Sequence, residues 1–217
     1  MICIAFSGGC LSGKTTAMNV VSEMAIARGF EVVKLSEIIR SALPPTESID
    51  ELRKDAKKYL AFELNVINAK IDAEINAYNK YYGNNRVVIV IDRAITDSMF
   101  YFMHYLNYNE LSIDEIEAAN RFLAVLRMHT NKAFEYIYTH VFEFTPLNVE
   151  NDDSLRPANI DSIKYVEHSH IHNLNMFAAS RGYEHKMEYF NLNNYESLDN
   201  MRRIVTEIID EEICRKR

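Results

Sequence analysis

The residues best suited to chemistry lie near the N-terminus, in the run Phe-Ser-Gly-Gly-Cys-Leu-Ser-Gly-Lys-Thr-Thr at positions 6–16. This run matches the phosphate-binding pattern G-x-x-x-x-G-K-[ST], with fixed positions at Gly8, Gly13, Lys14 and Thr15. Glycines adopt backbone angles that other residues avoid, so main-chain N–H groups can reach phosphate oxygens. The pattern predicts a loop that binds a nucleoside triphosphate; the alternative is a glycine-rich turn without a ligand.

Each part of this loop has a predicted role. Lys14 would neutralise the β- and γ-phosphates, and the Thr15 hydroxyl would hold Mg²⁺. A helix that starts after the loop would add about half a positive charge at its N-terminus. ATP and Mg²⁺ are therefore the expected cofactors, and the expected contacts with ATP come from Gly8, Gly9, Cys10, Leu11, Ser12, Gly13, Lys14, Thr15 and Thr16.

The elements on either side of the loop support this prediction. Apolar residues at positions 2–6 form a short run typical of a buried strand. After the loop, apolar residues recur at helical spacing from Ala17 to Ala27, and Gly29 is a predicted C-cap. The loop would thus join a strand to the N-terminus of a helix, as phosphate binding requires.

Four further apolar runs predict strands, and helical patterns separate them along the chain. The runs are Glu31–Leu35, Val87–Ile91, about Tyr136–Phe144 and about Glu188–Leu192. Strands that alternate with helices imply a parallel sheet covered on both faces. We expect an α/β fold with three layers, α/β/α, and a parallel sheet of about five strands.

The helical patterns are long, and only one polar segment interrupts the later part of the chain. The predicted helices are Ile49–Tyr82, a helix from the capping pair Ser112 and Glu115 to about Met128, Ile160–Arg181, and Ser197 to about Cys214. The polar segment at about 146–159 contains two prolines and resembles a mobile lid. Residues 1–217 are expected to form one domain.

Composition excludes several classes of protein. The chain has 217 residues, with 48% hydrophobic and 25% charged residues, which is typical of a soluble globular protein. No apolar run approaches the ~20 residues that span a membrane, and no secretory signal precedes the first strand. Three scattered cysteines predict neither disulfides nor a zinc site, so a cytoplasmic location is expected. The net charge of −7 disfavours tight binding to DNA.

A second candidate site follows the most apolar strand. Val87–Ile91 leads directly into Asp92 and Arg93. An acid at the end of a strand beside a phosphate loop binds Mg²⁺ directly or through water, although Asp92 could instead cap the helix that follows. Charged residues at the carboxyl end of a parallel strand face the ligand crevice, which favours Arg93 as a clamp on phosphate over a plain surface residue.

The segment Asp92-Arg93-x-x-x-Asp97-Ser98-x-x-Tyr101 resembles a segment of thymidylate kinases and deoxynucleoside kinases, which are P-loop enzymes. The order of elements is similar over most of the chain, including Phe144-Thr145-Pro146 before the lid. The lid segment Asp153-Ser154-Leu155-Arg156-Pro157 also resembles that of nicotinamide-riboside-type kinases. The resemblance implies a nucleotide-kinase-like P-loop fold and transfer of the γ-phosphate of ATP to a nucleoside or nucleotide.

The resemblance also implies roles for residues beyond the loop. Asp92 would hold the metal, and Arg93 would contact the acceptor or the transferring phosphate. Glu37 lies where deoxynucleoside kinases keep the carboxylate that takes the proton of the attacking hydroxyl, or it is a first-turn helix residue stabilised by the dipole. Arg156 would stabilise charge on the transferring group, or it is a solvated loop arginine. The lid of this family usually carries several arginines, and here it carries Arg156 alone.

Two other functions stay open. One is a kinase that acts on a hydroxymethylated base within DNA, favoured by a cleft lined with Lys54, Lys57 and Lys58. The other is a regulatory P-loop ATPase whose bound state recruits a partner. The acceptor, its base and sugar, and the oligomeric state are left open by the sequence, with a homodimer among the options; no membrane partner is expected.

Two sets of side chains remain ambiguous. Tyr59, Phe62 and Tyr101 either line an acceptor cleft or pack in the core. His168 and His172 share a helix face, but a pair of histidines with no neighbouring acid or cysteine is a weak metal-ligand set.

Overall fold

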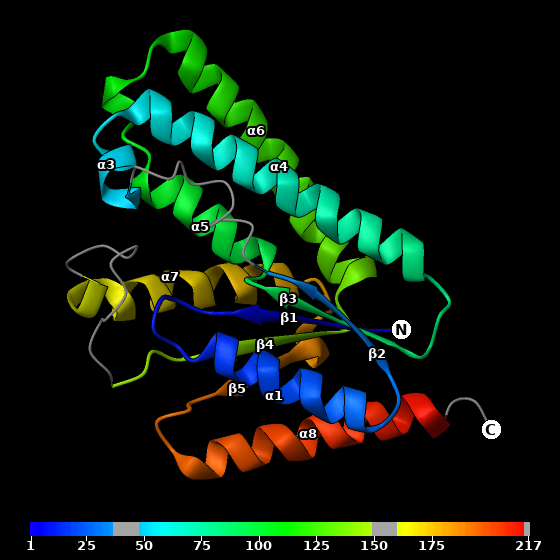
Figure 1. Cartoon of the computed structure of the whole chain (residues 1–217). Helices are drawn as coiled ribbons and strands as arrows, with labels where there is room; N and C mark the ends of the chain where they lie inside the picture. The colour runs from blue at the N-terminus through cyan, green and yellow to red at the C-terminus, as the bar shows by residue number, and fades with distance from the viewer. Residues whose placement is uncertain (37–47, 149–159, 215–217) are drawn as a thin grey trace.

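The structure, a computed structural model, describes residues 1–36, 48–148 and 160–214. Its centre is a sheet of five parallel strands in the order β2-β3-β1-β4-β5 (Figure 1). The strands are β1 (Ile2–Ser7), β2 (Glu31–Leu35), β3 (Val87–Asp92), β4 (His140–Phe144) and β5 (Met187–Phe190). The prediction of a parallel five-stranded sheet is therefore confirmed.

Strand register places the polar ends of three strands at one edge of the sheet. In the parallel ladders Phe6 of β1 pairs with Asp92 of β3, and Ser7 pairs with Glu143 of β4. All strands run in the same direction, so their carboxyl ends meet where the first loop begins. This is the edge at which open α/β sheets bind ligands.

Helices cover both faces of the sheet and make three layers. α1 (Lys14–Ala27) and α8 (Tyr195–Cys214) cover one face, as Figure 1 shows. The other face carries a longer set of helices: α3 (Ile49–Arg53), α4 (Ala56–Tyr81), α5 (Ile95–Tyr105), α6 (Ile113–Lys132) and α7 (Ile160–Ala179). The predicted α/β/α architecture is confirmed.

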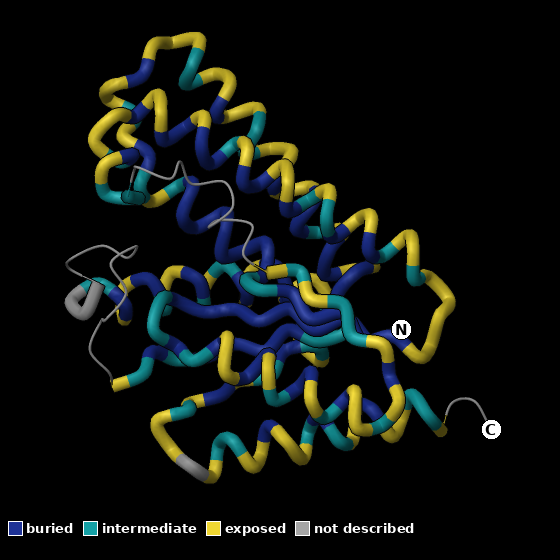
Figure 2. Tube along the Cα trace, in the orientation of Figure 1, coloured by how far each residue is buried: buried dark blue, intermediate teal, exposed yellow. Residues whose placement is uncertain are grey.

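The continuous apolar run of β3 follows from burial on both faces. Val87, Ile89 and Ile91 pack with α4, α5 and α6, whereas Val88 and Val90 pack with α1. Strands β1, β3 and β4 are almost continuously buried in Figure 2, whereas the edge strand β2 is partly exposed. A strand with alternating polar residues could not occupy this position, because both of its faces are removed from water.

Two predicted elements are wrong in their boundaries. The helix expected over Ile49–Tyr82 is broken, because Asp55 leaves the helical conformation and its side chain accepts hydrogen bonds from the N–H groups of Lys57 and Lys58. This N-cap starts a new helix. Apolar spacing alone did not indicate the break, because the hydrophobic pattern continues across it.

The strand expected at about Tyr136–Phe144 starts only at His140. α6 runs past Met128 to Lys132, and a π-helical turn (Ala133–Ile137) follows it. Aromatic and β-branched residues favour strands in general, but here Phe134 and Ile137 are buried on a helical turn. The Ser112–Glu115 capping box forms as predicted. The C-cap of α1 is Arg28, one residue before the predicted Gly29, which follows it with a left-handed φ of 77°.

Among the described residues no helix combines the length and apolar character that crossing a membrane requires. Two predicted site residues, Glu37 and Arg156, lie outside the described residues. The same holds for most of the predicted lid at about 146–159.

Candidate active site at the carboxyl edge of the sheet

The first loop has the backbone geometry that its glycines imply. Gly8 has a φ of 138° and Gly13, the residue before α1, a φ of 81°. A Cβ atom at Gly8 would lie 2.5 Å from the carbonyl oxygen of Phe144 at the end of β4. The loop therefore needs glycine at position 8 for two reasons, the backbone angle and the close approach of β4.

Lys14 points back into the loop that precedes it. Its Nζ donates hydrogen bonds to the carbonyl oxygens of Gly8 (2.8 Å) and Gly9 (2.6 Å) and to Oγ of Ser12 (2.9 Å). Burial and the nearby charge of Arg93 lower the pKa of Lys14, whereas Asp97 and Asp92 act to raise it. The ammonium group thus lies inside the curve of the loop, where it can neutralise phosphate.

Thr15 and Asp92, the predicted Mg²⁺ ligands, lie at the start of α1 and at the end of β3. Thr15 is exposed and Asp92 is half-buried, so neither residue is closed off in the core. The described residues contain no cluster of three His, Cys, Asp or Glu side chains that could hold a metal alone. The donor set fits Mg²⁺, which takes one or two protein oxygens and completes its shell with phosphates and water.

Arg93 has an unusual backbone and an unusual environment. Its φ is 69°, which costs free energy in any residue other than glycine. Its guanidinium group lies over the ring of Tyr101, 4.7 Å from the centroid, and Nη2 is 3.7 Å from Sγ of Cys10. Nη1 is buried without a hydrogen-bond partner. The strained turn therefore directs a charged group with an unused donor at the loop.

A buried ion pair supports this strained turn. Nζ of Lys70 on α4 donates hydrogen bonds to the carbonyl oxygens of Asp92 (3.3 Å) and Arg93 (2.5 Å) and pairs with Glu74 at 2.9 Å. Burial acts to raise the pKa of Glu74, but the charge of Lys70 and hydrogen bonds from His129 and Lys70 outweigh it and lower the pKa. A Lys–Glu pair four residues apart normally indicates an exposed helix face, so this buried role could not be predicted from the sequence.

Asp97 is fully buried beneath the loop. One carboxylate oxygen accepts a hydrogen bond from the hydroxyl of Ser7, and the other accepts one from the N–H of Gly8 at 3.1 Å. Burial raises the pKa of Asp97 to about 6, although Lys14 and Arg93 act to lower it. Asp97 lies in the Asp92–Tyr101 motif, but its spacing there does not indicate that it is buried beneath the loop.

α7 also contacts the loop, although more than 150 residues separate the two in the chain. Glu167 accepts hydrogen bonds from the N–H of Cys10 (3.2 Å) and from the hydroxyls of Tyr101 (3.1 Å) and Tyr105 (2.7 Å). A Cβ atom at Gly9 would lie 3.1 Å from the carbonyl oxygen of Lys164. No signal in the sequence indicates this long-range contact.

A second arginine and a buried acid extend the site towards α3 and α4. Tyr101 and Tyr105 stack with their ring centroids 5.9 Å apart, and the guanidinium of Arg53 lies 3.4 Å from the centroid of Tyr105. Burial raises the pKa of Glu63 to about 7, against a hydrogen bond from Tyr59 and the charges of Arg53 and Arg93. We call Tyr101 and Tyr105, with Arg93 and Arg53 upon them, the tyrosine shelf.

Tyr59, Phe62 and Tyr101 were expected either to line an acceptor cleft or to pack in the core, and they lie largely in the core. Tyr59 and Phe62 are buried and belong to the cluster that packs on β3. Tyr101 is buried too, but its ring carries Arg93 and its hydroxyl reaches Glu167. Among the three, Tyr101 is the residue in direct contact with the loop, through its hydroxyl 3.5 Å from Sγ of Cys10.

The prediction that no acid lies beside His168 and His172 is wrong. Nδ1 of His172 is 2.8 Å from Oε1 of buried Glu143, and Nδ1 of His168 is 4.0 Å from the same oxygen. Glu143 lies on β4 and is distant in sequence, so helical spacing could not indicate it. The backbone of His168 also lies against the loop, because a Cβ atom at Gly9 would be 3.4 Å from its N atom.

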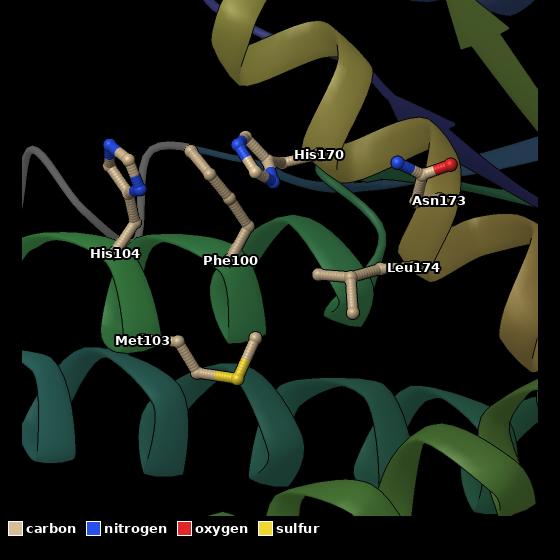
Figure 3. A pocket seen from close by; sticks show the side chains of 6 residues that line it. All are labelled: Phe100, Met103, His104, His170, Asn173 and Leu174. Atoms are coloured by element: carbon tan, nitrogen blue, oxygen red, sulfur yellow. The ribbon is translucent and has the colours of Figure 1, made fainter.

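A small pocket opens between α5 and α7, beside the tyrosine shelf. Its volume is about 280 Å³, and Figure 3 shows His104 and Phe100 of α5 facing His170 and Asn173 of α7. Phe100 stacks on both histidines, with centroids 4.9 Å and 5.8 Å apart. None of the predicted site residues lines this pocket.

Together, the sheet order, the glycine loop before α1 and the acid–arginine pair after β3 define a P-loop nucleoside triphosphatase with a nucleoside- or nucleotide-kinase-like fold. Residues 3–180 match the family described as an AAA domain (AAA_28), and the chain belongs to this family. Curated protein sequences contain no match to the chain.

Comparison with solved structures supports the same fold. One match is a crystal structure of NadR protein in complex with NR, with a TM-score of 0.59 and 17% sequence identity. The match covers 87% of this chain and 45% of that one, so the chain spans less than half of the NadR structure. At this identity the likeness shows the fold, and the functional argument depends on the site.

Proposed function

We propose that this protein is an ATP-dependent phosphotransferase that moves the γ-phosphate of ATP to a small nucleoside or nucleotide acceptor. The observation that carries the proposal is Arg93, held by a strained turn beside the loop. Its buried Nη1 has no hydrogen-bond partner, although Oδ2 of Asp97 forms a long ion pair with it at 3.9 Å. An arginine in this position suits a phosphoryl group in transfer, because a guanidinium offers several donors in fixed geometry.

The proposed mechanism depends on positioning and on neutralising charge. Main-chain N–H groups of the loop and Lys14 hold the phosphates of ATP, and Thr15 and Asp92 hold Mg²⁺, which supplies charge neutralisation when bound. Arg93 contacts the acceptor side or the transferring group. Glu37 is the proposed acceptor of the hydroxyl proton, and Arg156 is a proposed second source of positive charge.

The tyrosine shelf favours a kinase over a regulatory ATPase. It extends from Cys10 in the loop towards α3, and a second buried donor without a partner, Nε of Arg53, lies at its far end. Buried donors rarely lack a partner in a folded protein. One such donor beside the phosphate loop and another at the far end of the shelf are suited to an acceptor with polar groups, whereas hydrolysis requires water alone.

The surface charges favour a small acceptor over DNA. Lys54 pairs with Glu51 at 2.5 Å, and Lys57 pairs with Glu115 at 3.2 Å, so acids partly neutralise the proposed basic cleft. Binding to a nucleic acid depends on cationic side chains that replace counterions of the phosphates. NadR, the fold relative above, was solved with NR, which makes a nucleoside of that kind one acceptor to test.

The test is transfer of labelled γ-phosphate from ATP with Mg²⁺ to separate acceptors. The panel contains nucleosides, nucleoside monophosphates, nicotinamide riboside, and plain or hydroxymethylated DNA. We expect label on a small acceptor and a loss of about 100-fold or more in kcat for Arg93→Met. Arg121→Met, a change on the exposed face of α6, is the matched control and should leave transfer unchanged.

Two results would overturn the proposal. Label on hydroxymethylated DNA alone would support the DNA-modifying kinase. Label released only as inorganic phosphate, whichever acceptor is present, would support the regulatory ATPase.

A further inference from the structure

A chain of buried polar groups joins α7 to the start of the loop. Asn175 on α7 has no exposed surface, and its Nδ2 donates to the hydroxyl of Ser7 (2.8 Å) and to Oε2 of Glu143 (2.8 Å). Its Oδ1 accepts a hydrogen bond from the hydroxyl of Thr96 on α5. One amide thus connects α7 to β1, β4 and α5.

The chain continues from Ser7 into the loop. The hydroxyl of Ser7 donates to Asp97, and Asp97 accepts the N–H of Gly8, the first fixed residue of the phosphate-binding pattern. Gly8 also lies against the end of β4, next to Glu143. The position at which the chain leaves β1 and turns into the loop is therefore held through Ser7 and Asp97.

Only one orientation of the Asn175 amide satisfies these partners. Glu143 is an acceptor, so it must face the NH₂ group; a flipped amide would place two oxygens against each other with no proton between them. Both hydrogens of Nδ2 and one lone pair of Oδ1 are then used. A fully satisfied buried network of this kind is rigid, because any displacement leaves a polar group unpaired.

We propose that Asn175 is a positioning residue for the phosphate loop. By bridging Ser7 and Glu143 it keeps Asp97 on the N–H of Gly8 and so sets the geometry in which the loop binds nucleotide phosphates. This inference rests on the proposal that the loop binds ATP. Its test therefore measures binding of ATP and not phosphoryl transfer.

The test compares two substitutions that remove the amide donor in different ways. Asn175→Asp keeps the shape but places a second carboxylate beside Glu143, and Asn175→Leu removes both polar groups. The dissociation constant of a fluorescent N-methylanthraniloyl-ATP is measured with Mg²⁺ at pH 8 and pH 6. At pH 8 we expect both variants to bind about tenfold or more weakly than the wild type.

The two variants should differ at pH 6. Two close carboxylates share a proton, so the Asn175→Asp pair becomes singly charged as pH falls and a donor returns to the position of the amide. The ratio of variant to wild-type dissociation constants should fall towards one for Asn175→Asp and stay high for Asn175→Leu. A loss of affinity caused only by missing packing or hydrogen bonds would be the same at both pH values.

Other titrating groups are common to every variant, so the ratio for Asn175→Leu, which adds no charge, shows how far these groups alone change binding between the two pH values. On the side of Glu143 these are His172 and His168 of α7. On the side of Ser7 they are Asp97 of α5, whose pKa is about 6, with Lys14 and Arg93 beyond it. Asn173→Asp adds the same charge at an exposed position two residues away on α7 and should bind as the wild type does.

A smaller change keeps the test decisive if the Asn175 variants do not fold. Ser7→Ala removes the hydroxyl that joins Asn175 to Asp97, and we expect weaker binding at both pH values. Wild-type affinity in Asn175→Asp at pH 8 or in Ser7→Ala would overturn the positioning role. A wild type that does not bind the probe would overturn the proposed function as well, whereas binding without transfer would count against the transferase alone.

Discussion

At the scale of single residues, the site contains charged groups that the fold removes from water at a cost. Glu63 is one example: its pKa is raised to about 7, mainly by burial. An acid with a raised pKa stabilises the folded state relative to the unfolded chain only while it is protonated. This contribution is complete below about pH 4.5 and is lost as pH rises through about 7.

We therefore predict that Glu63→Gln stabilises the protein at pH 8. The shift corresponds to about 3 kcal/mol, so the free energy of unfolding should rise by about 1–3 kcal/mol at pH 8 and change little at pH 5. Urea unfolding of the wild type and the variant at pH 8 and pH 5 measures the change in the free energy of unfolding at each pH. Asp72→Asn, an exposed change on the same helix, should have no pH-dependent effect; equal effects of Glu63→Gln at both pH values would contradict the prediction.

Lys14 should be essential for transfer but not for folding. Lys14→Ala removes the ammonium group inside the loop, and we expect transfer to fall below detection while the far-ultraviolet circular dichroism spectrum is unchanged. Steady-state transfer and circular dichroism on the same preparation are the measurement. Turnover equal to that of the wild type would refute the whole assignment of the loop.

At the scale of elements, α4 matters because it supports the turn after β3. Lys70 on α4 holds two carbonyl oxygens of that turn and also neutralises Glu74. Removing one partner of a buried pair leaves an uncompensated charge, whereas removing both is often tolerated. Through Lys70, this helix therefore supports the backbone geometry of the site.

Lys70→Met should destabilise the protein by about 3–5 kcal/mol, because Glu74 remains buried without its cation. The double variant Lys70→Met with Glu74→Gln should recover a large part of that loss while the strained Arg93 turn stays unsupported. Urea unfolding gives the stabilities. Lys80→Met, at the exposed end of α4, should change stability by less than about 0.5 kcal/mol; a double variant no more stable than Lys70→Met would argue against the ion pair.

The elements also show what could be predicted from sequence and what could not. The glycine-rich motif predicts the loop, short apolar runs predict the five strands, and apolar residues three or four positions apart predict the helices. The structure contains these elements in the predicted order. The break at Asp55 and the helical turn before β4 were missed, because a capping side chain and a buried π-turn do not alter the apolar spacing. Glu143, Asn175 and Glu167 were missed because their partners are brought together only by the sheet.

At the scale of the whole molecule, ligand binding and stability should be linked. ATP with Mg²⁺ binds the folded state, so the free energy of unfolding should rise by about 2.7 kcal/mol at a ligand concentration of 100 Kd. For a chain of this size the melting temperature should rise by roughly 5–10 °C. Replacing Mg²⁺ with EDTA should reduce this rise in melting temperature, and Lys14→Ala should abolish it. A rise of the same size with and without Mg²⁺ would count against a metal role for Thr15 and Asp92.

The strand order has a consequence for how the chain folds during synthesis. β1 is made first, yet it pairs with β3 and β4, so that Ile4 lies beside Val90 and His140. The nucleotide loop then depends on α7, where Asn175 meets Ser7 across 168 residues of sequence. At a translation rate of about 5–20 residues per second, β1 is synthesised roughly 10–30 s before Asn175, the last of these partners. During that interval the apolar residues of β1 lack their partner strands, and a chaperone that recognises such segments would have time to engage them.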